Sequence, residues 1–369
     1  MAYFDYSATT KVEESVLDTY NKVIKDYFYN PNSIYEDALQ VKKLIDRATL
    51  NIKETLKIDG DIIYTSSASE ANNLALKGIC SKYRNRGHII MTTLYEHPSI
   101  YETLKYLEGF GFKTLFIPYK NKELDYDFIK ENLSSDVLMI TTSLVSSELG
   151  IVTDYQKIRS LLKSYPDIFY HVDAVQGFTK LPILFDAVDL LTISGHKIFA
   201  PKSIGFLYKK KSVELDPLIH GGASTSIYRS GTPDAALIAS LSKAIRLGYE
   251  RMKEHYNYVS HLRDDLLLFL KDYPHILINS SVYPFILNLS FVGEKGEVVQ
   301  RYFDMENILL STKSSCSSKK DYSEVVYNYT LSKDRATSSI RISLSYKTSQ
   351  EDIQLLKKAI EKIYNKLYS

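Results

Sequence analysis

Short apolar runs alternate with amphipathic segments through the first two thirds of the chain. Seven of these runs have the length and residue types of buried strands: IIYTS, HIIMTT, TLFIPY, VLMITTSLV, IFYHVDAV, LLTISGH and IGFLYK. Segments with helical spacing of apolar residues, such as DYQKIRSLLKSY, separate them. This alternation predicts an α/β fold with a mostly parallel, doubly wound central sheet.

The last third of the chain has a different pattern. From about Pro233 to Tyr273 the apolar residues recur at helical spacing, and the later runs FILNLSF and SIRISLS are typical of strands. The segment SQEDIQLLKKAIEKIYNKL predicts a closing amphipathic helix. We therefore expect a large domain over residues 15–246 and a smaller α/β domain over residues 247–369, completed by residues 1–14.

The amino-acid composition indicates which class of molecule the protein binds. The chain is 44% hydrophobic and 24% charged, and its 46 basic and 44 acidic side chains leave a net charge of +2. Such a balance creates no field that would attract nucleic acid or an anionic membrane, so a small-molecule substrate is favoured. No run approaches the roughly 18 apolar residues of a membrane span, and MAYFDYSATT lacks a signal pattern, so we expect a cytoplasmic protein.

One candidate anion site lies early in the chain. The segment DIIYTSSASEANNLALKG predicts a strand, a turn of small hydroxyl residues and a helix that begins near Ser69. The N–H groups and the dipole at such a helix N-terminus can bind an anion. Ser67 or Ser69 could equally be an ordinary N-cap, and this segment alone does not decide between the two interpretations.

A lysine at a strand end is the second candidate. Ser194, His196 and Lys197 follow the apolar run LLTIS, among small residues and side chains that could bind a phosphate. A lysine forms a Schiff base when it can lose its proton, which burial and neighbouring positive charge favour. A solvated lysine is the ordinary alternative, because lysines are rarely buried without a partner.

Two more strand ends carry polar residues. The run IFYHVDAVQG brings Asp173 and Gln176 to the end of a strand, where a buried carboxylate could pair with a protonated pyridine nitrogen. An aspartate that caps a loop is the plainer interpretation. His97 follows HIIMTTLYE and could stack on a cofactor ring or cap a helix that begins at Pro98.

Taken together and in this order, these clusters resemble those of the cysteine desulfurases in the class V aminotransferase group, specifically the IscS/NifS-like branch. The resemblance extends over nearly the whole chain, through YFDYSATT, NPNS, TSSASEANNLALKG, EHPSI, YHVDAVQG, SGHKIFAPKSIG, HGGA, YRSGT, ILNLSF and SSIRISLS. It implies a fold type I enzyme that uses pyridoxal 5'-phosphate (PLP) to convert L-cysteine to L-alanine.

The resemblance also implies how PLP would be held. Lys197 would carry the cofactor, Asp173 would pair with its pyridine nitrogen, and His97 would stack on its ring. Gln176 would lie beside the pyridoxal oxygen. The implied phosphate contacts are Ala68, Ser69, Ser194, His196 and, from a second subunit, Thr232. A homodimer is therefore expected.

Two residues of the last third would handle the substrate. Arg341 matches the arginine that holds the substrate carboxylate, a role suited to the guanidinium fork. Cys316, in ILLSTKSSCSS, matches the cysteine that takes sulfur as a persulfide and delivers it to an acceptor protein, such as an iron–sulfur scaffold. The only other cysteine, Cys80 in LALKGIC, is expected to be buried, so that neither a disulfide framework nor a metal cluster is indicated.

Several positions depart from the pattern of the branch. Ser147, in SLVSSELG, stands where an asparagine usually contacts the phenolic oxygen of the cofactor, Tyr35 replaces a histidine, and Lys313 replaces a glycine. The segment HGGASTSIYRSGT lacks the usual glycine-glutamine-glutamate string. Two alternatives therefore stay open: another class V PLP enzyme, such as an aminotransferase or a selenocysteine lyase, and a PLP-fold protein with a mainly regulatory or binding role.

Overall fold

The computed structural model describes residues 1–120, 122–312 and 321–368. They form two compact units. Unit 1 comprises Met1–Thr9, Val145–Val152 and Met252–Ser369, and unit 2 comprises Thr10–Leu144 and Thr153–Arg251. Within the described residues, no helix combines the length and the apolar character that crossing a membrane requires.

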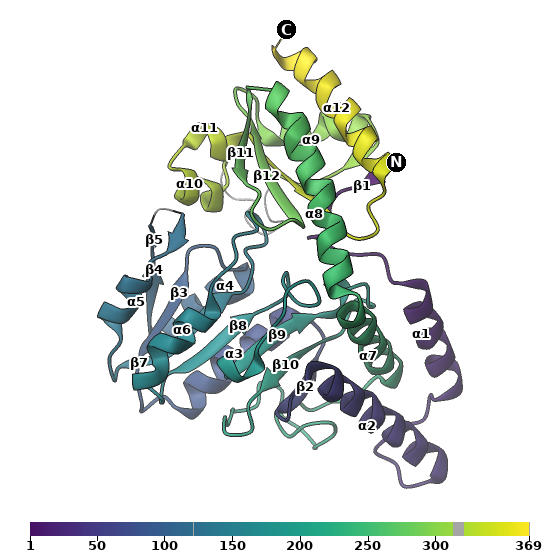
Figure 1. The fold of residues 1–369 in the computed structure, drawn as a ribbon. Helices are drawn as coiled ribbons and strands as arrows, with labels where there is room; N and C mark the ends of the chain where they lie inside the picture. The colour runs from purple at the N-terminus through teal and green to yellow at the C-terminus, as the bar shows by residue number, and fades with distance from the viewer. Residues whose placement is uncertain (121, 313–320, 369) are drawn as a thin grey trace. The chain divides into compact units, whose positions relative to one another are not determined.

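Unit 2 is built on a seven-stranded sheet with the strand order β2-β10-β9-β8-β7-β3-β4 (Figure 1). Its strands are β2 (Asp61–Thr65), β3 (Ile89–Thr93), β4 (Lys113–Ile117), β7 (Val137–Ser143), β8 (Phe169–Asp173), β9 (Leu190–Ser194) and β10 (Gly205–Lys209). Strand β10 runs antiparallel to β2 and β9, and the remaining pairs are parallel. Each of the seven apolar runs forms one of these strands, so the predicted mostly parallel sheet is confirmed.

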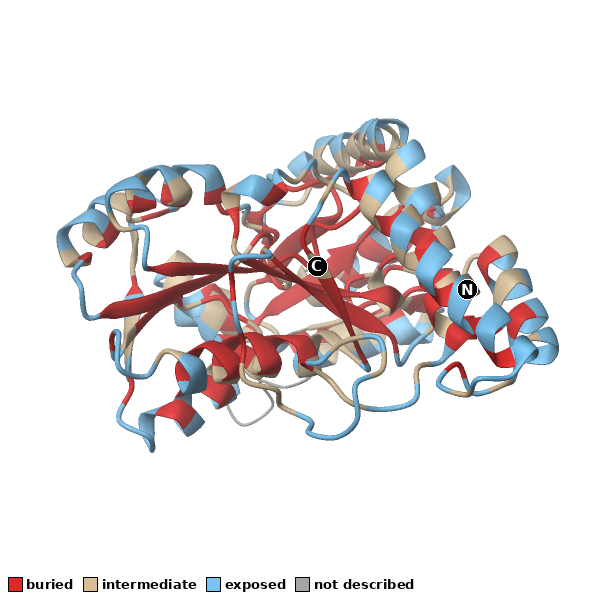
Figure 2. Cartoon of the chain, turned by 90° about the horizontal axis from the view of Figure 1, so that it is seen from below, coloured by how far each residue is buried: buried red, intermediate tan, exposed pale blue. Residues whose placement is uncertain are grey.

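Burial explains why these strands appear in the sequence as continuous apolar runs. Every residue of β8, β9 and β10 is buried, and the strands are red along most of their length in Figure 2, whereas the helices carry exposed stripes. A strand that is covered on both faces has no solvent side on which polar residues could alternate.

The helices of unit 2 follow the amphipathic segments. They are α1 (Glu14–Asp26), α2 (Glu36–Leu56), α3 (Ala68–Lys82), α4 (Pro98–Glu108), α5 (Tyr126–Asn132), α6 (Tyr155–Leu161), α7 (Ala235–Glu250) and the short η1 (Leu162–Ser164), η2 (Phe185–Ala187) and η3 (Gly195–Lys197). A small hairpin joins β5 (Tyr119–Lys120) to β6 (Glu123–Leu124). Helix α7 packs against α1 and α2, and α3 packs against α4.

Unit 1 contains an antiparallel sheet in the order β11-β12-β14 and a parallel pair of β1 with β13. Its strands are β1 (Ala2–Tyr3), β11 (Ile276–Ser280), β12 (Ile286–Phe291), β13 (Ile308–Leu309) and β14 (Ser339–Ser343). Its helices are α8 (Met252–Phe269), η4 (Leu270–Asp272), α9 (Gly296–Met305), α10 (Glu324–Thr330), α11 (Lys333–Thr337) and α12 (Gln350–Tyr368). The predicted strands FILNLSF and SIRISLS are β12 and β14, and the predicted closing helix is α12.

Candidate active site

Neighbouring strands of unit 2 bring predicted cofactor residues to one edge of the sheet. Asp173 is the last residue of β8, Ser194 is the last residue of β9, and Lys197 ends the η3 turn that follows β9. Since β8 and β9 are parallel neighbours, their carboxyl ends lie side by side. In open α/β sheets this edge is where ligands bind.

The buried carboxylate of Asp173 is held by two donors. Asn72, on α3, donates from Nδ2 to Asp173 Oδ2 at 2.8 Å, and the backbone N–H of Val175 donates to Oδ1 at 3.0 Å. These two donors fix the position of the Asp173 carboxylate at the end of β8.

His97 caps the helix that begins at Pro98. Its Nδ1 accepts a hydrogen bond from the Ser99 backbone N–H at 3.1 Å and lies 2.9 Å from Ser99 Oγ. Burial lowers the pKa of His97, the Asp173 carboxylate opposes this effect, and the positive charge of Lys197 adds to it. The capping interpretation is thus correct for Nδ1, while Nε2 and the ring faces are not used by the cap.

The turn that carries Lys197 is fixed by its backbone. Thr10 donates to the carbonyl oxygen of His196 from its N–H at 2.9 Å and from Oγ1 at 3.0 Å. A Cβ at Gly195 would lie 2.9 Å from the carbonyl oxygen of Ile204, so only glycine fits there. Burial, with the charges of Lys197 and Lys202, lowers the pKa of His196 to about 4, and its imidazole is therefore neutral near pH 7.

Ala68 and Ser69 form the first turn of α3, whose N-cap is Ser67. The Ser67 side chain accepts from the Glu70 backbone N–H at 3.2 Å. The helix thus begins one residue before the predicted position, and the capping interpretation holds for Ser67. The remaining N–H groups of this turn lie at the N-terminus of a 15-residue helix, where the predicted phosphate contact stays a prediction.

An ion pair ties this turn to the segment YRSGT. Arg229 donates from Nε to Glu70 Oε1 at 2.8 Å, while the N–H and the hydroxyl of Ser66 donate to Oε2 at 2.7 and 2.6 Å. Burial alone would raise the pKa of Glu70, but the hydrogen bonds from Arg229 and Ser66 lower it overall. Thr232, three residues beyond Arg229, is exposed.

A second buried carboxyl group precedes His97. Glu96 accepts from Thr93 Oγ1 at 2.7 Å and from the N–H and hydroxyl of Ser143 at 2.9 and 2.6 Å. Despite these donors, burial raises the pKa of Glu96 to about 7, and the nearby Asp173 charge adds to the rise. This contact joins the ends of β3 and β7.

Arg341 is the centre of a polar network in unit 1. It lies on β14 and is only 4% exposed. Its Nη1 donates to the carbonyl oxygen of Ser147 at 2.9 Å, and its Nη2 donates to Asp5 Oδ1 at 2.8 Å. The buried Nε has no hydrogen-bond partner among the residues that the structure describes. The guanidinium is therefore held in place by two of its five N–H donors, and its buried Nε–H points to no partner in the described residues.

Two contacts flank the predicted sulfur acceptor. Ser311 exchanges two backbone hydrogen bonds with Arg341, at 3.3 and 2.6 Å, and the hydroxyl of Ser323 donates to the carboxylate of Glu148. Cys316, like Lys313, falls within residues 313–320, outside the described residues. The structure therefore gives no position for the predicted sulfur acceptor.

The structure also shows the burial and contacts of three other residues that the sequence analysis singled out. Gln176 is buried, and its backbone carbonyl oxygen accepts from Lys180 Nζ at 3.2 Å. Cys80 is fully buried on α3, where burial raises the pKa of its thiol to about 12, so its predicted burial is confirmed. Tyr35 is half exposed at the N-cap of α2.

Three residues that hold predicted site residues in place were not identified from the sequence: Asn72 and Ser99 in unit 2, and Asp5 in unit 1. Each lies inside a motif that carries the family resemblance, namely TSSASEANNLALKG, EHPSI and YFDYSATT. Their partners are distant in sequence, by 101 residues for Asn72 and Asp173 and by 336 for Asp5 and Arg341. The polar residue types were visible, but the pairs that they form were not.

Residues 2–356 match the profile of the family described as aminotransferase class-V. The chain belongs to this family. Within it, the chain is 33% identical to cysteine desulfurase IscS of Dictyoglomus turgidum (strain DSM 6724 / Z-1310), over 99% of this chain and 95% of the relative. The predicted membership of the IscS/NifS-like branch is therefore confirmed.

Solved structures agree with this placement of the class-V chain. A NifS-like protein superposes with a TM-score of 0.94 at 28% sequence identity, with 100% of both chains covered. The protein SspA in complex with cysteine superposes with a TM-score of 0.81 at 31% identity, covering 93% of this chain and 99% of that one. The class-V chain has the fold of the fold type I PLP enzymes, as predicted.

Proposed function

We propose that this class-V chain is a PLP-dependent cysteine desulfurase, which converts L-cysteine to L-alanine and passes the sulfur to Cys316 as a persulfide. The proposal rests on the grouping of Lys197, Asp173 and His97 at one edge of the sheet, where both charges act on the pKa of His97. The relatives named cysteine desulfurase IscS support the same activity.

The residues of unit 2 suit PLP. The ionised Asp173 would hold a proton on the pyridine nitrogen, and the neutral His97 could pack on the ring without adding a charge. The buried Oδ1 of Asn72 finds no donor in the described part of the chain, as expected where a ligand or water completes a site. Bound PLP would supply an electron sink for bond changes at the α-carbon of the substrate.

The remaining chemistry falls to side chains of this chain. Lys197 would anchor the cofactor and move a proton to and from the substrate α-carbon. Arg341 would bind the substrate carboxylate, using the donor at Nε and the fork that Asp5 and the Ser147 carbonyl already orient. The complex of SspA with cysteine supports cysteine as the ligand of this fold.

Cys316 would complete the reaction. Its thiolate would attack the substrate sulfur, so that an S–S bond forms while the C–S bond breaks and the carbon takes up a proton to give alanine. The persulfide would then pass to an acceptor protein, for which the resemblance to the IscS/NifS-like branch implies an iron–sulfur scaffold. A cytoplasmic location remains a prediction.

We further propose that the enzyme is a homodimer to which Thr232 contributes across the interface. Large apolar side chains are exposed near Thr232, with exposed fractions of 71% for Phe28, 92% for Ile34 and 71% for Ile227. Exposed apolar groups of this size are typical of interfaces between subunits. Phe28 and Thr232 line one hollow of about 270 Å³.

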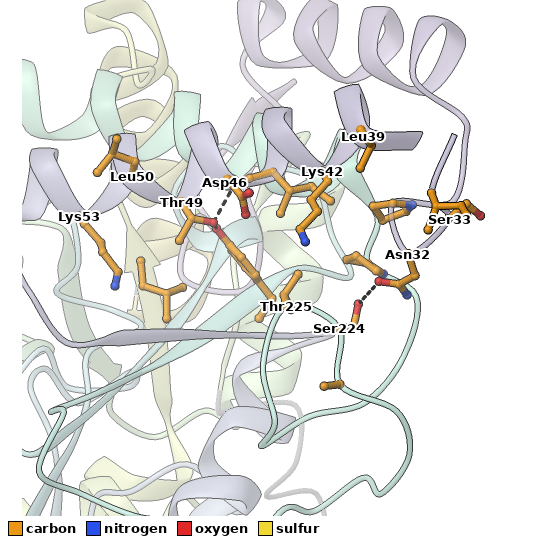
Figure 3. Close-up of a pocket in the computed structure, with 17 residues that line it drawn as sticks. Asn32, Ser33, Leu39, Lys42, Asp46, Thr49, Leu50, Lys53, Ser224 and Thr225 are labelled. Carbon is orange, nitrogen blue, oxygen red and sulfur yellow. Dashed lines mark hydrogen bonds between the residues drawn. The ribbon is translucent and has the colours of Figure 1, made fainter. Parts of the chain in front are cut away.

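A larger hollow of about 610 Å³ adjoins the first, because Pro31 and Pro233 line both. In Figure 3, the α2 side chain of Lys42 points toward the segment that carries Ser224 and Thr225. This segment belongs to HGGASTSIYRSGT, in which the resemblance implies that Thr232 contacts the second subunit. A second copy of the chain is the occupant that we propose for both hollows.

The dimer can be tested with a charge on the exposed apolar surface. Ile227→Asp should give a monomer in analytical ultracentrifugation and should weaken PLP retention, since the phosphate would lose the Thr232 contact. Val282→Asp is the matched control, because Val282 is 73% exposed but belongs to unit 1. A wild-type protein that sediments as a monomer would contradict the proposed homodimer.

The activity is tested by product analysis. The protein purified with PLP receives L-cysteine and a reducing thiol, and alanine and sulfide are measured. We expect equal amounts of both from the wild type, none from Cys316→Ala, and retained PLP absorption in that variant. Cys80→Ala is the control, because the other cysteine is buried with its thiol pKa raised to about 12.

Other products would point to the alternative functions. Keto-acid-dependent amino transfer would indicate an aminotransferase, and turnover of selenocysteine alone would indicate a selenocysteine lyase. A protein that binds PLP and turns over none of these substrates would indicate a regulatory or binding role.

A further inference from the structure

Asn72 connects two residues of the cofactor site. Its Nδ2 donates to Asp173 Oδ2 at 2.8 Å and to Ser99 Oγ at 2.9 Å. Asn72 is fully buried on α3, while Ser99 lies in the first turn of α4 and Asp173 ends β8. One amide group thus spans three elements that pack around the edge of the sheet.

The orientation of this amide follows from its neighbours. An ionised carboxylate only accepts hydrogen bonds, so the group beside Asp173 must be the NH2 of Asn72 and not its oxygen. The same NH2 supplies the second donor to Ser99 Oγ. With a lone pair of Oγ occupied in this way, the hydroxyl proton of Ser99 is directed to another acceptor, and His97 Nδ1 lies 2.9 Å away.

The state of His97 follows in turn. A backbone N–H is always a donor, so the bond from Ser99 N–H to Nδ1 at 3.1 Å requires that Nδ1 carry no proton. A neutral imidazole then carries its proton on Nε2. Protonation of Nδ1 would break the bond from the Ser99 N–H and would require the Ser99 hydroxyl to accept instead of donating, and therefore disfavours the imidazolium form.

We propose that Asn72 and Ser99 are positioning residues that join Asp173 to His97 and hold His97 as a neutral imidazole with its proton on Nε2. This inference rests on the proposed function for the identity of the cofactor, but its geometry lies wholly within unit 2. The chain of contacts runs Asp173, Asn72, Ser99, His97. It couples the partner of the pyridine nitrogen to the residue proposed to cover the ring.

Two charged groups face His97 from other elements, Asp173 on β8 and Lys197 after β9. They act on its pKa in opposite directions. Burial, the largest influence, lowers that pKa, and the hydrogen bond from the Ser99 N–H determines which ring nitrogen carries the proton. Loss of the Asn72 contact would free the Ser99 hydroxyl to rotate and would leave Asp173 with one donor fewer.

The test uses the cofactor-free protein, so it depends on neither PLP nor turnover. Ring-nitrogen NMR of labelled histidine, with the signal assigned through His97→Gln, reports the protonated nitrogen and the pKa. The wild type should show a proton on Nε2 and none on Nδ1. In Asn72→Ala and Ser99→Ala the pKa of His97 should rise by about half to one unit, the size expected for one lost hydrogen bond.

Matched variants separate positioning from packing. Ser99→Thr keeps the hydroxyl and should keep the wild-type pKa of His97. Asn73→Ala removes the neighbouring asparagine, whose Nδ2 donates to the Ser69 backbone carbonyl within α3, and should leave the pKa of His97 unchanged. In the loaded protein, Asn72→Ala should release PLP roughly 2- to 10-fold more readily, whereas Asn73→Ala should not.

An unchanged tautomer and pKa of His97 in both Asn72→Ala and Ser99→Ala would overturn the inference. If Asn72→Ala fails to fold, Ser99→Ala decides, because that side chain is small and only partly buried. Failure of the desulfurase assay with a confirmed shift of His97 would remove the proposed substrate and leave the positioning role intact.

Discussion

The two units hold their candidate residues in different ways. In unit 2, Asp173, Ser194 and Lys197 follow directly from the register of adjacent parallel strands. In unit 1, Arg341 is oriented by side chain and carbonyl contacts to Asp5 and Ser147, which are 336 and 194 residues away in sequence. A sheet edge thus positions groups through backbone geometry, whereas a network positions them through partners that must all be present.

The two units also differ in how the charges of their candidate residues are paired. The carboxylate of Asp173 is matched by neutral donors from Asn72 and Val175, which leave its full charge for a cationic ligand. The guanidinium of Arg341 is already paired with Asp5, so an anionic ligand would share it. Binding in unit 2 therefore completes a site, and binding in unit 1 redistributes an existing contact.

The largest effect should come from the lysine of unit 2. Lys197→Ala should abolish covalent PLP attachment and reduce alanine formation at least about a thousandfold, because both the anchor and the proton-transfer group are lost. Borohydride reduction followed by peptide mass analysis measures the attachment. Lys211→Ala, at an exposed ion pair with Asp59, is the control. Reduced PLP still attached to the Lys197→Ala chain would show that another lysine carries the cofactor.

The buried Glu96 should make unit 2 sensitive to pH. The pKa of Glu96 lies above that of an exposed glutamate, so its contribution to stability is complete below about pH 4.5 and is lost as the pH rises through about 7. A pKa rise from 4.5 to about 7 corresponds to about 3 kcal/mol. Between pH 5 and 8, Glu96→Gln should therefore lose less stability than the wild type in urea unfolding.

The control for this experiment is Glu102→Gln, an exposed position on α4, the helix that follows Glu96. Its unfolding free energy should follow the wild type at every pH. Parallel pH profiles for Glu96→Gln and the wild type would mean that the buried carboxyl does not titrate in this range.

Substrate binding at the polar network of unit 1 should depend on the planar, forked shape of the Arg341 guanidinium. Arg341→Lys keeps the charge but loses the fork, so KM for L-cysteine should rise roughly 30-fold, equivalent to about 2 kcal/mol, with a smaller change in kcat. Arg335→Lys is the control, because Arg335 of unit 1 bonds Asn279 and the Ile278 carbonyl. A lower kcat at unchanged KM would argue against a carboxylate contact at Arg341.

The smallest effect should follow from restoring the residue usual in the branch. The contact of Ser147 with Arg341 is made by the backbone carbonyl, so Ser147→Asn should leave the guanidinium in place. The asparagine side chain is longer than serine and should contact the cofactor directly. This contact should raise kcat/KM for L-cysteine about threefold. Steady-state kinetics on the two proteins measure it, and a loss of activity would indicate that serine suits a different substrate.

The sequence predicts the strands and site residues of unit 2 more completely than the extent and strand pairing of unit 1. Strands buried on both faces leave continuous apolar runs, and a polar residue after such a run marks the sheet edge, so Asp173 and Lys197 could be identified one at a time. The segment Val145–Val152 lies between strands of unit 2 yet belongs to unit 1. No local pattern indicates that change of unit, nor the pairing of β1 with β13.

The sequence also does not predict which side chains form hydrogen bonds with one another. The sequence indicates that His97 could cap a helix or bind a ligand, but only the structure shows that the cap uses Nδ1. Likewise, Asn72 is an ordinary helix residue until its contact with Asp173 is known. A residue's own neighbours set its secondary structure, whereas its role depends on which distant group it meets.

The ion pair of Glu70 with Arg229 limits how this chain can evolve. The two residues are 159 positions apart, and loss of either would leave the other as a half-buried charge without its partner. Substitutions at these positions must therefore be fixed together or be compensated nearby. The residues of HGGASTSIYRSGT that precede Arg229 take no part in this ion pair, so the constraint falls on the arginine alone within that segment.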